Sequence, residues 1–263
     1  MKLIDTHCHV YDEAFRDDLP QVIERARQAG LELLLLPAVN PDTLDDLLRV
    51  CSTWPDLCRP MIGLHPEDLA ADYHSQLAGL KALIDSDRAA GGAHRYIGIG
   101  ETGLDLYWDK TRLKEQIDSF CIQIEWALEY DLPIVIHSRD SFEPLYEVMS
   151  RYRDTSLKGI FHCFSGSEAE AAALMEFGGF MFGIGGVLTY KKSALPSVLE
   201  HIPMQRVVLE TDCPYLPPVP FRGKRNEPSY IVNTAAVMAQ VYGCSVEHVA
   251  EVTGCNARRL FRL

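Results

Sequence analysis

Histidine and acidic residues recur along this chain at the ends of short apolar stretches, a placement suited to metal binding. The first example is LIDTHCH at 3–9, in which two histidines flank a cysteine. Four imidazoles and two carboxylates stand at such positions: His7, His9, Glu101, His137, His162 and Asp212. These donors suit divalent ions such as Zn²⁺, Mn²⁺, Ni²⁺ or Co²⁺, with Mg²⁺ less natural beside so many histidines. One such histidine alone is more often a satisfied polar residue, but several together would be costly to bury without a shared partner.

Eight apolar stretches alternate with amphipathic stretches along the chain. Strands are predicted at 2–8, 31–39, 59–65, 96–101, 132–138, 158–164, 179–186 and 206–212. Helical patterns occupy 19–30, 41–54, 112–131 and 167–179, and two more helices are expected within 229–261. Alternation of this kind implies parallel pairing, and eight such units in about 250 residues match a (β/α)8 TIM barrel. We therefore expect one α/β barrel domain over 1–263; an open doubly wound sheet, the competing fold, would place its chemistry at one switch point.

In a closed barrel the carboxyl ends of all strands meet at one mouth, so the six residues are expected to form one cluster. Six ligands exceed one tetrahedral site, and two cations roughly 3.5–4 Å apart would use them all. Such a pair typically serves phosphoester hydrolysis, because it supplies hydroxide and neutralises the charge that develops on the phosphoryl oxygens. A carboxylate would bridge the two ions, and Asp212 is expected to accept or shuttle the proton of the attacking water.

The cysteines raise the question of thiolate ligands. The chain has eight cysteines and no CxxC pair, a pattern typical of reduced thiols. Because strand side chains alternate between faces, Cys8 is expected to point away from the ligands His7 and His9. By the same rule Cys163 and Cys213 should point away from the ligand that precedes each of them. Small apolar packing behind the metal centre is the predicted role.

Composition limits the partners and the location. The formal net charge of −12 argues against a broad basic surface that coats nucleic acid. No apolar stretch approaches the roughly 20 residues of a membrane span, and the start lacks the apolar region of a secretory signal. We expect a cytoplasmic protein without a membrane partner, and a monomer.

The motifs DTHCH, GLHP, GETGLD, HSRD, HCFSG, GVLTY and ETDCP occur in this order. Together they make the chain resemble the TatD-type metal-dependent deoxyribonucleases over nearly its whole length. The resemblance implies a (β/α)8 barrel with two divalent cations that hydrolyses DNA phosphodiesters. It also implies that His7, His9 and Asp212 hold one ion and His137 and His162 the other, with Glu101 bridging.

Five residues are predicted to contact substrate: His65, Arg139, Arg222, Lys224 and Asn226. His65 ends the third strand, and Arg139 could clamp a phosphate two residues after His137. The stretch FRGKRNEP resembles the family's Arg-Gly-Lys-x-Asn-x-Pro segment, which implies the last three. Tyr190 fits either base stacking or plain packing. Four other histidines are expected to be solvated side chains: His74, His94, His201 and His248.

These features favour a nuclease that acts on single-stranded DNA or strand ends, with 3′–5′ exonuclease-like action. A small-molecule amidohydrolase, lactonase or phosphoesterase with the same two-ion site is the first alternative. A non-catalytic protein whose metals hold the barrel is the second, although structural zinc sites are usually closed and rich in cysteine.

Overall fold

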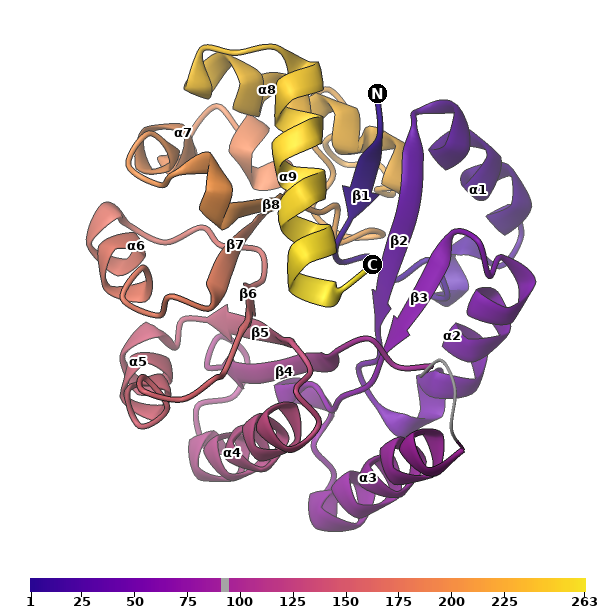
Figure 1. The fold of residues 1–263 in the computed structure, drawn as a ribbon, viewed down its shortest axis with the longest axis vertical. Coiled ribbons are helices and arrows are strands. Elements are labelled where there is room, and N and C mark those ends of the chain that lie inside the picture. Colours follow the sequence, from indigo (N-terminus) through magenta and orange to yellow (C-terminus); the bar gives the residue numbers. More distant parts are fainter. Residues whose placement is uncertain (91–94) are drawn as a thin grey trace.

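Parallel strands form a closed ring in this computed structural model, which describes residues 1–90 and 95–263 (Figure 1). The strands are β1 (Leu3–Asp5), β2 (Leu31–Pro37), β3 (Cys58–Met61), β4 (Ile99–Asp105), β5 (Ile134–Arg139), β6 (Gly159–Phe161), β7 (Phe180–Ile184) and β8 (Val207–Leu209). They pair in order as β1 to β3 and β4 to β8, always parallel. A bridge between Ile62 and Ile99 joins β3 to β4, and Thr6 N donates to Leu209 O at 3.0 Å to join β8 to β1. The (β/α)8 prediction is confirmed.

Helices follow the strands and surround the ring (Figure 1). They are α1 (Leu19–Gln28), α2 (Pro41–Thr53), α3 (Tyr73–Ala89), α4 (Leu113–Glu129), α5 (Phe142–Ser150), α6 (Glu168–Leu174), α7 (Leu195–Leu199), α8 (Ile231–Tyr242) and α9 (Val246–Phe261). Local sequence fixes several ends: Ser167 and Glu170 form a reciprocal capping box on α6, and α8 ends at Gly243 with a positive φ of 63°. None of the helices in the described residues has the length and apolar content to span a bilayer.

Alternate residues of the strands separate two apolar clusters. The inner cluster takes one or more side chains from each strand region: Ile4, Leu33, Leu35, Met61, Ile97, Val135, Ile160, Met181 and Val208. Three residues of α9 complete it, namely Ala257, Leu260 and Phe261. Helix α9 crosses the ring in Figure 1, and its Arg258 pairs with Glu32 near the start of β2. It therefore covers the amino-terminal end of the barrel and leaves the other end open for the site.

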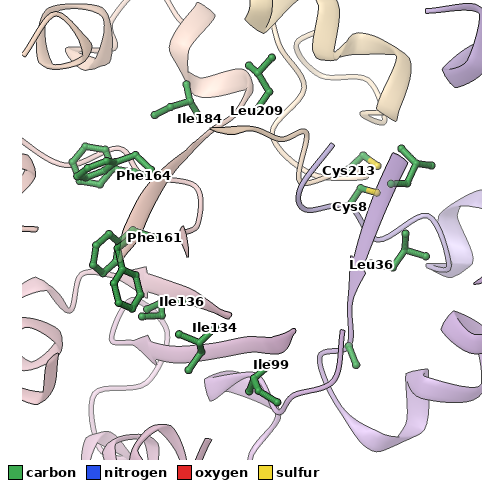
Figure 2. Packing of buried hydrophobic residues seen from close by; sticks show 14 of the residues in the cluster. Cys8, Leu36, Ile99, Ile134, Ile136, Phe161, Phe164, Ile184, Leu209 and Cys213 are labelled. Carbon is green, nitrogen blue, oxygen red and sulfur yellow. The ribbon is translucent and has the colours of Figure 1, made fainter. Parts of the chain in front are cut away.

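The outer cluster lies between strands and helices. Figure 2 shows its members, such as Leu36, Ile134 and Ile136, directed away from the barrel axis. Val135 and His137, two residues apart on β5, lie on the inner face of the barrel. The same holds for Ile160 on β6 and His162, which follows that strand. Strand alternation thus turns apolar inner positions into polar ones towards the carboxyl ends.

Some predicted boundaries were wrong. The fourth strand begins at Ile99 and continues to Asp105, so Glu101 lies inside it rather than at its end. The reason is Gly103, at which a Cβ would lie 2.1 Å from His137 O, so only glycine lets β4 pair closely with β5. Strands β1 and β8 end before the residues predicted, and the loops that follow them carry His7, His9 and Asp212.

Candidate metal centre

All six predicted ligands converge at the carboxyl-terminal mouth, and His65 joins them. The described residues contain four groups of three potential ligands, and within each group the ligand atoms lie within 4.8 Å of one another. The groups are His7–His9–Asp212, His7–Glu101–His162, His65–Glu101–His137 and His162–Cys163–Asp212. The barrel has therefore brought together side chains that are up to about two hundred residues apart in the sequence.

Glu101 lies at the centre of this cluster and divides it. Its Oε1 is 3.0 Å from His137 Nδ1 and 3.7 Å from His162 Nε2. Its Oε2 is 3.1 Å from His7 Nε2 and 3.6 Å from His9 Nε2. The two oxygens of this carboxylate thus face different imidazoles, and Oε1 also has His65 Nε2 at 3.6 Å. A carboxylate arranged in this way can serve two ions.

Asp212 completes the group that contains His7 and His9. Its Oδ1 lies 3.7 Å from His7 Nε2 and 3.5 Å from His9 Nε2, and the two nitrogens are 3.0 Å apart. Donor atoms that are each about 2 Å from one ion lie roughly 3–3.5 Å from each other. These separations and the mixed N and O donor set fit a divalent cation.

Three residues that the sequence interpretation missed contact the far side of the imidazoles. His137 Nε2 lies 2.9 Å from Asp105 Oδ2, and His162 Nδ1 lies 3.0 Å from Glu210 Oε1. Such partners fix the ring orientation of a metal-binding histidine. Strand alternation could have indicated Glu210, because it precedes Asp212 by two residues and so shares its face. The Glu210 carboxylate also requires glycine at position 183, where a Cβ would lie 2.2 Å from Glu210 Oε2.

Tyr11 is the third missed residue, and it determines the tautomer of His9. Its hydroxyl donates to Pro37 O at 2.7 Å and lies 3.0 Å from His9 Nδ1. Because that hydroxyl proton is already used, the hydroxyl oxygen must accept from His9 Nδ1–H. In the neutral ring, the Nε2 of His9, which faces Glu101 and Asp212, is therefore the nitrogen whose lone pair can bind a cation.

The carboxylates control the charge on two buried imidazoles. Burial lowers the pKa of His137, but Asp105 and Glu101 outweigh it and raise that pKa to about 9. Burial opposes charge on His162 as well, yet Glu210, Glu101 and Asp212 raise its pKa to about 10. Without a cation, protons on these rings balance the negative charge of the centre.

Glu101 and Asp212 remain ionised. Burial raises the pKa of Glu101, but the imidazoles of His7, His162 and others outweigh burial and hold it well below its usual range. The pKa of Asp212 is likewise lowered, because His162, His9 and His7 outweigh the effect of burial. Both carboxylates can therefore ligate a cation near neutral pH.

His65 lies at the edge of the cluster and is only 8% exposed. Its Nδ1 accepts a hydrogen bond from Glu67 N at 3.2 Å, so the proton of the neutral ring is on Nε2. Burial, followed by repulsion from His137, lowers the pKa of His65 to about 3. Nε2–H, 3.6 Å from Glu101 Oε1, is a neutral donor directed at the centre.

The three cysteines beside ligands behave in two ways. Cys8 and Cys213 are fully buried in the outer cluster and lie together in Figure 2, as predicted. The prediction for Cys163 was wrong, because its Sγ groups with His162 and Asp212. Its backbone has a left-handed φ of 47° and its N–H donates to Glu210 Oε1 at 2.6 Å, so strand alternation does not apply there.

The predicted basic residues lie on the rim, and two of them stack on aromatic rings. The Arg139 guanidinium lies 3.6 Å from the centroid of Tyr107, and that of Arg222 lies 3.8 Å from the centroid of Tyr190. Lys224 is exposed. The Tyr190 hydroxyl donates to Pro217 O at 3.2 Å, so this side chain has a packing role beneath Arg222.

The prediction that Asn226 contacts substrate was wrong. The side chain is fully buried, and its Nδ2 donates to Thr211 O at 2.8 Å and to Tyr215 O at 2.6 Å. Its Oδ1 accepts from Glu227 N at 2.9 Å. Asn226 instead holds the loop that carries Asp212.

The remaining histidines lie away from the centre. His74, His201 and His248 are exposed, as predicted. His94 belongs to 91–94 and lies outside the described residues.

A closed (β/α)8 barrel with buried histidines and carboxylates at its mouth defines a class of metal-dependent hydrolases. The family model described as TatD related DNase matches residues 4–262. The chain therefore belongs to the TatD-related family of metal-dependent hydrolases.

Individual relatives agree with this placement. An uncharacterized metal-dependent hydrolase, YabD of Bacillus subtilis strain 168, is 37% identical over 99% of both chains. A 3′-5′ ssDNA/RNA exonuclease TatD of Edwardsiella piscicida is 29% identical over 99% of this chain and 100% of its own. The crystal structure of YjjV, a TatD homologue of Escherichia coli K12, superimposes with a TM-score of 0.90 at 29% identity, over 99% of this chain and 98% of that one.

Proposed function

We propose that this chain is a deoxyribonuclease that removes nucleotides from the 3′ ends of single-stranded DNA with two divalent cations. The observation that carries the proposal is the position of the Glu101 carboxylate, whose two oxygens face different imidazoles: Oε2 faces His7 and Oε1 faces His137. The relative named as a 3′-5′ ssDNA/RNA exonuclease supports the choice of substrate and direction.

Two ions are assigned to the two sides of Glu101. His7, His9 and Asp212 would hold one ion, and His137 with His162 would hold the other, with Glu101 shared. The resident metal is one of Zn²⁺, Mn²⁺, Mg²⁺, Ni²⁺ or Co²⁺, and the imidazoles favour the borderline ions over Mg²⁺. When bound, such a pair supplies Lewis acidity and lowers the pKa of water.

The chain's own groups then handle the proton and the phosphate. Asp212 is ionised and partly exposed at the mouth, so it can accept the proton of the attacking water. The Nε2–H of His65 can donate to a phosphoryl oxygen, since this ring is neutral at physiological pH. Arg139, exposed on the rim, can pair with the phosphate of the strand.

The test combines metal content with the fate of labelled strands. Metal per chain is measured by mass spectrometry, and single-stranded DNA labelled at its 5′ end is digested with and without chelator. We expect a ladder that shortens from the 3′ end and disappears with chelator. Less than about one metal per chain together with chelator-insensitive digestion would contradict the two-ion mechanism.

Two further substrates separate the alternatives. Uniform nicking of closed circular DNA without digestion from ends would contradict an exonuclease. Hydrolysis of lactones or cyclic amides, with oligonucleotides left intact, would replace the nuclease with a small-molecule hydrolase. Asp212→Asn should abolish hydrolysis, and Asp17→Asn, an exposed change before α1, is the matched control.

A further inference from the structure

Two large aromatic side chains are exposed side by side in the loop after β4. Trp108 is 70% exposed and Tyr107 is 49% exposed. Their rings meet edge to face, with centroids 4.7 Å apart and an interplanar angle of 89°. Trp126, by contrast, is 3% exposed and Trp54 packs against the core. Two adjacent aromatic rings left in water form a candidate binding surface.

This loop is attached directly to the metal centre. Tyr107 N donates at 2.8 Å to Asp105 Oδ1, and the other oxygen of that carboxylate contacts His137. Leu106 N donates at 2.9 Å to Arg139 O, which joins the loop to the end of β5. The aromatic pair is thus held two and three residues from a group that orients a candidate ligand.

A cation accompanies the rings. The Arg139 guanidinium lies 3.6 Å from the Tyr107 centroid and 5.6 Å from that of Trp108. Arg139 is exposed to solvent, so its charge is available to a phosphate. Stacking also holds the guanidinium in place before a ligand arrives.

We propose that Tyr107, Trp108 and Arg139 form a stacking platform for the unpaired bases of a single-stranded nucleic acid whose end enters the mouth. The proposal rests on the proposed function and names the residues that select its substrate. Bases of a single strand can expose their π-faces, and a positive group beside aromatic rings binds base and backbone together. A duplex hides those faces, and the net charge of −12 provides little general attraction for one.

The binding test uses the metal-loaded full-length protein and fluorescent strands with phosphorothioate linkages, which resist hydrolysis. One strand is oligothymidylate, and a second of equal length carries abasic sugars. Wild type should bind the first more tightly, and Trp108→Ala should weaken that binding about 5- to 150-fold, the range for loss of one stacked base. Affinity for the abasic strand should change far less.

Two variants make the result specific. Trp108→Phe keeps an aromatic face and should recover most of the affinity, while Leu83→Ala removes a 44% exposed side chain from α3 and should have no effect. Quenching of tryptophan fluorescence by oligothymidylate should disappear in Trp108→Phe, because Trp126 is buried and Trp54 is partly buried against the core, away from this loop.

The outcomes keep the two proposals separate. Equal affinity of Trp108→Ala and wild type for oligothymidylate, or of wild type for both strands, overturns the platform even if DNA is digested. Base-dependent binding through Trp108 without any hydrolysis overturns the nuclease and keeps the platform. In an active enzyme, Trp108→Ala should raise KM for oligonucleotides and lower the preference for them over bis(para-nitrophenyl) phosphate.

Discussion

At the scale of single residues, the centre is organised by groups that never need to touch an ion. Asp105, Glu210 and Tyr11 each contact the far nitrogen of a different imidazole. They leave the near nitrogens directed at Glu101 or Asp212. The rings are therefore oriented before a cation binds, which lowers the cost of assembling the site.

Glu210→Gln tests this orientation directly. The change keeps the size of the side chain but removes the charge beside His162 Nδ1, so metal affinity or activity should fall about 10- to 100-fold. Titration of the chelated protein with Zn²⁺ or Mn²⁺ measures the change. Glu200→Gln, an exposed change after α7, is the control. Unchanged affinity in Glu210→Gln would show that His162 needs no partner.

Metal binding should release protons. Without a cation, the pKa values of His137 and His162 are about 9 and 10, so both rings are protonated near neutral pH. An imidazole must be neutral to bind a metal ion, so the apparent affinity for the ion should rise with pH until the pH exceeds these pKa values. Calorimetry in buffers of different ionisation enthalpy counts the protons. No release at neutral pH would contradict the raised pKa values.

The protonated rings of His137 and His162 also stabilise the metal-free protein, so its stability should fall as pH rises, whereas its metal affinity should increase. Raised folded-state pKa values mean that their contribution to stability is fully present below about pH 6.5 and is lost as pH rises through about 9 and 10. Urea unfolding of the chelated protein at several pH values measures this loss. It should be absent from the metal-loaded protein, since cations then take the place of the protons.

At the scale of elements, the loop after β8 is held by ion pairs to α1. Arg25 binds both carboxylate oxygens of Glu227, with its Nη2 2.6 Å from Oε2, and Arg225 binds Asp18 at 2.7 Å. Arg225 therefore has a structural role, while its neighbours Arg222 and Lys224 stay on the rim. The loop is basic in sequence, but only part of its charge is available to substrate.

Glu227→Gln should weaken this attachment. The loss of charge-assisted hydrogen bonds at a half-covered pair should cost about 1–2 kcal/mol in the free energy of unfolding at neutral pH. Burial raises the pKa of Glu227, but Arg25 and Ser229 outweigh it and lower it overall. Its contribution is therefore present above about pH 4.3 and is lost as pH falls below that value. Urea unfolding of both proteins should converge in acid; a constant difference would contradict the ion-pair explanation.

The elements also show how far the sequence could predict the structure. Hydrophobic patterning located all eight strands, because each carries a short and largely continuous apolar run. It misplaced β4, because Gly103 reads as a strand breaker yet is required by the approach of His137. The family resemblance misassigned Asn226 and strand alternation misassigned Cys163, because side-chain burial and a left-handed φ depend on contacts that are distant in sequence.

At the scale of the whole molecule, one end of the barrel is covered by α9 and the other end carries the candidate metal centre. Helix α9 inserts Leu260 and Phe261 into the inner cluster, each 5% exposed. The inner layer changes from apolar residues at that end to carboxylates and imidazoles at the other. Stability and chemistry are therefore supplied by different layers of the same strands.

Phe261→Ala should separate these two layers. Removal of a buried phenyl ring typically costs about 3–5 kcal/mol, so the urea midpoint should fall markedly. Below that midpoint, metal content per chain should stay normal, because the ligands lie at the opposite end. Loss of metal from the folded variant would show that α9 also supports the centre.

The seam between the first and last strands has a consequence in time. His7 O accepts from Asp212 N at 2.9 Å, and Cys213 O accepts from His9 N at 2.8 Å, so the chain must return to its beginning before the centre exists. A ribosome has to deliver more than two hundred residues before the first histidines meet their aspartate. The proposed metal centre can therefore be completed only late in synthesis, because a chain that stalls before β8 lacks Asp212, the last of the six candidate ligands.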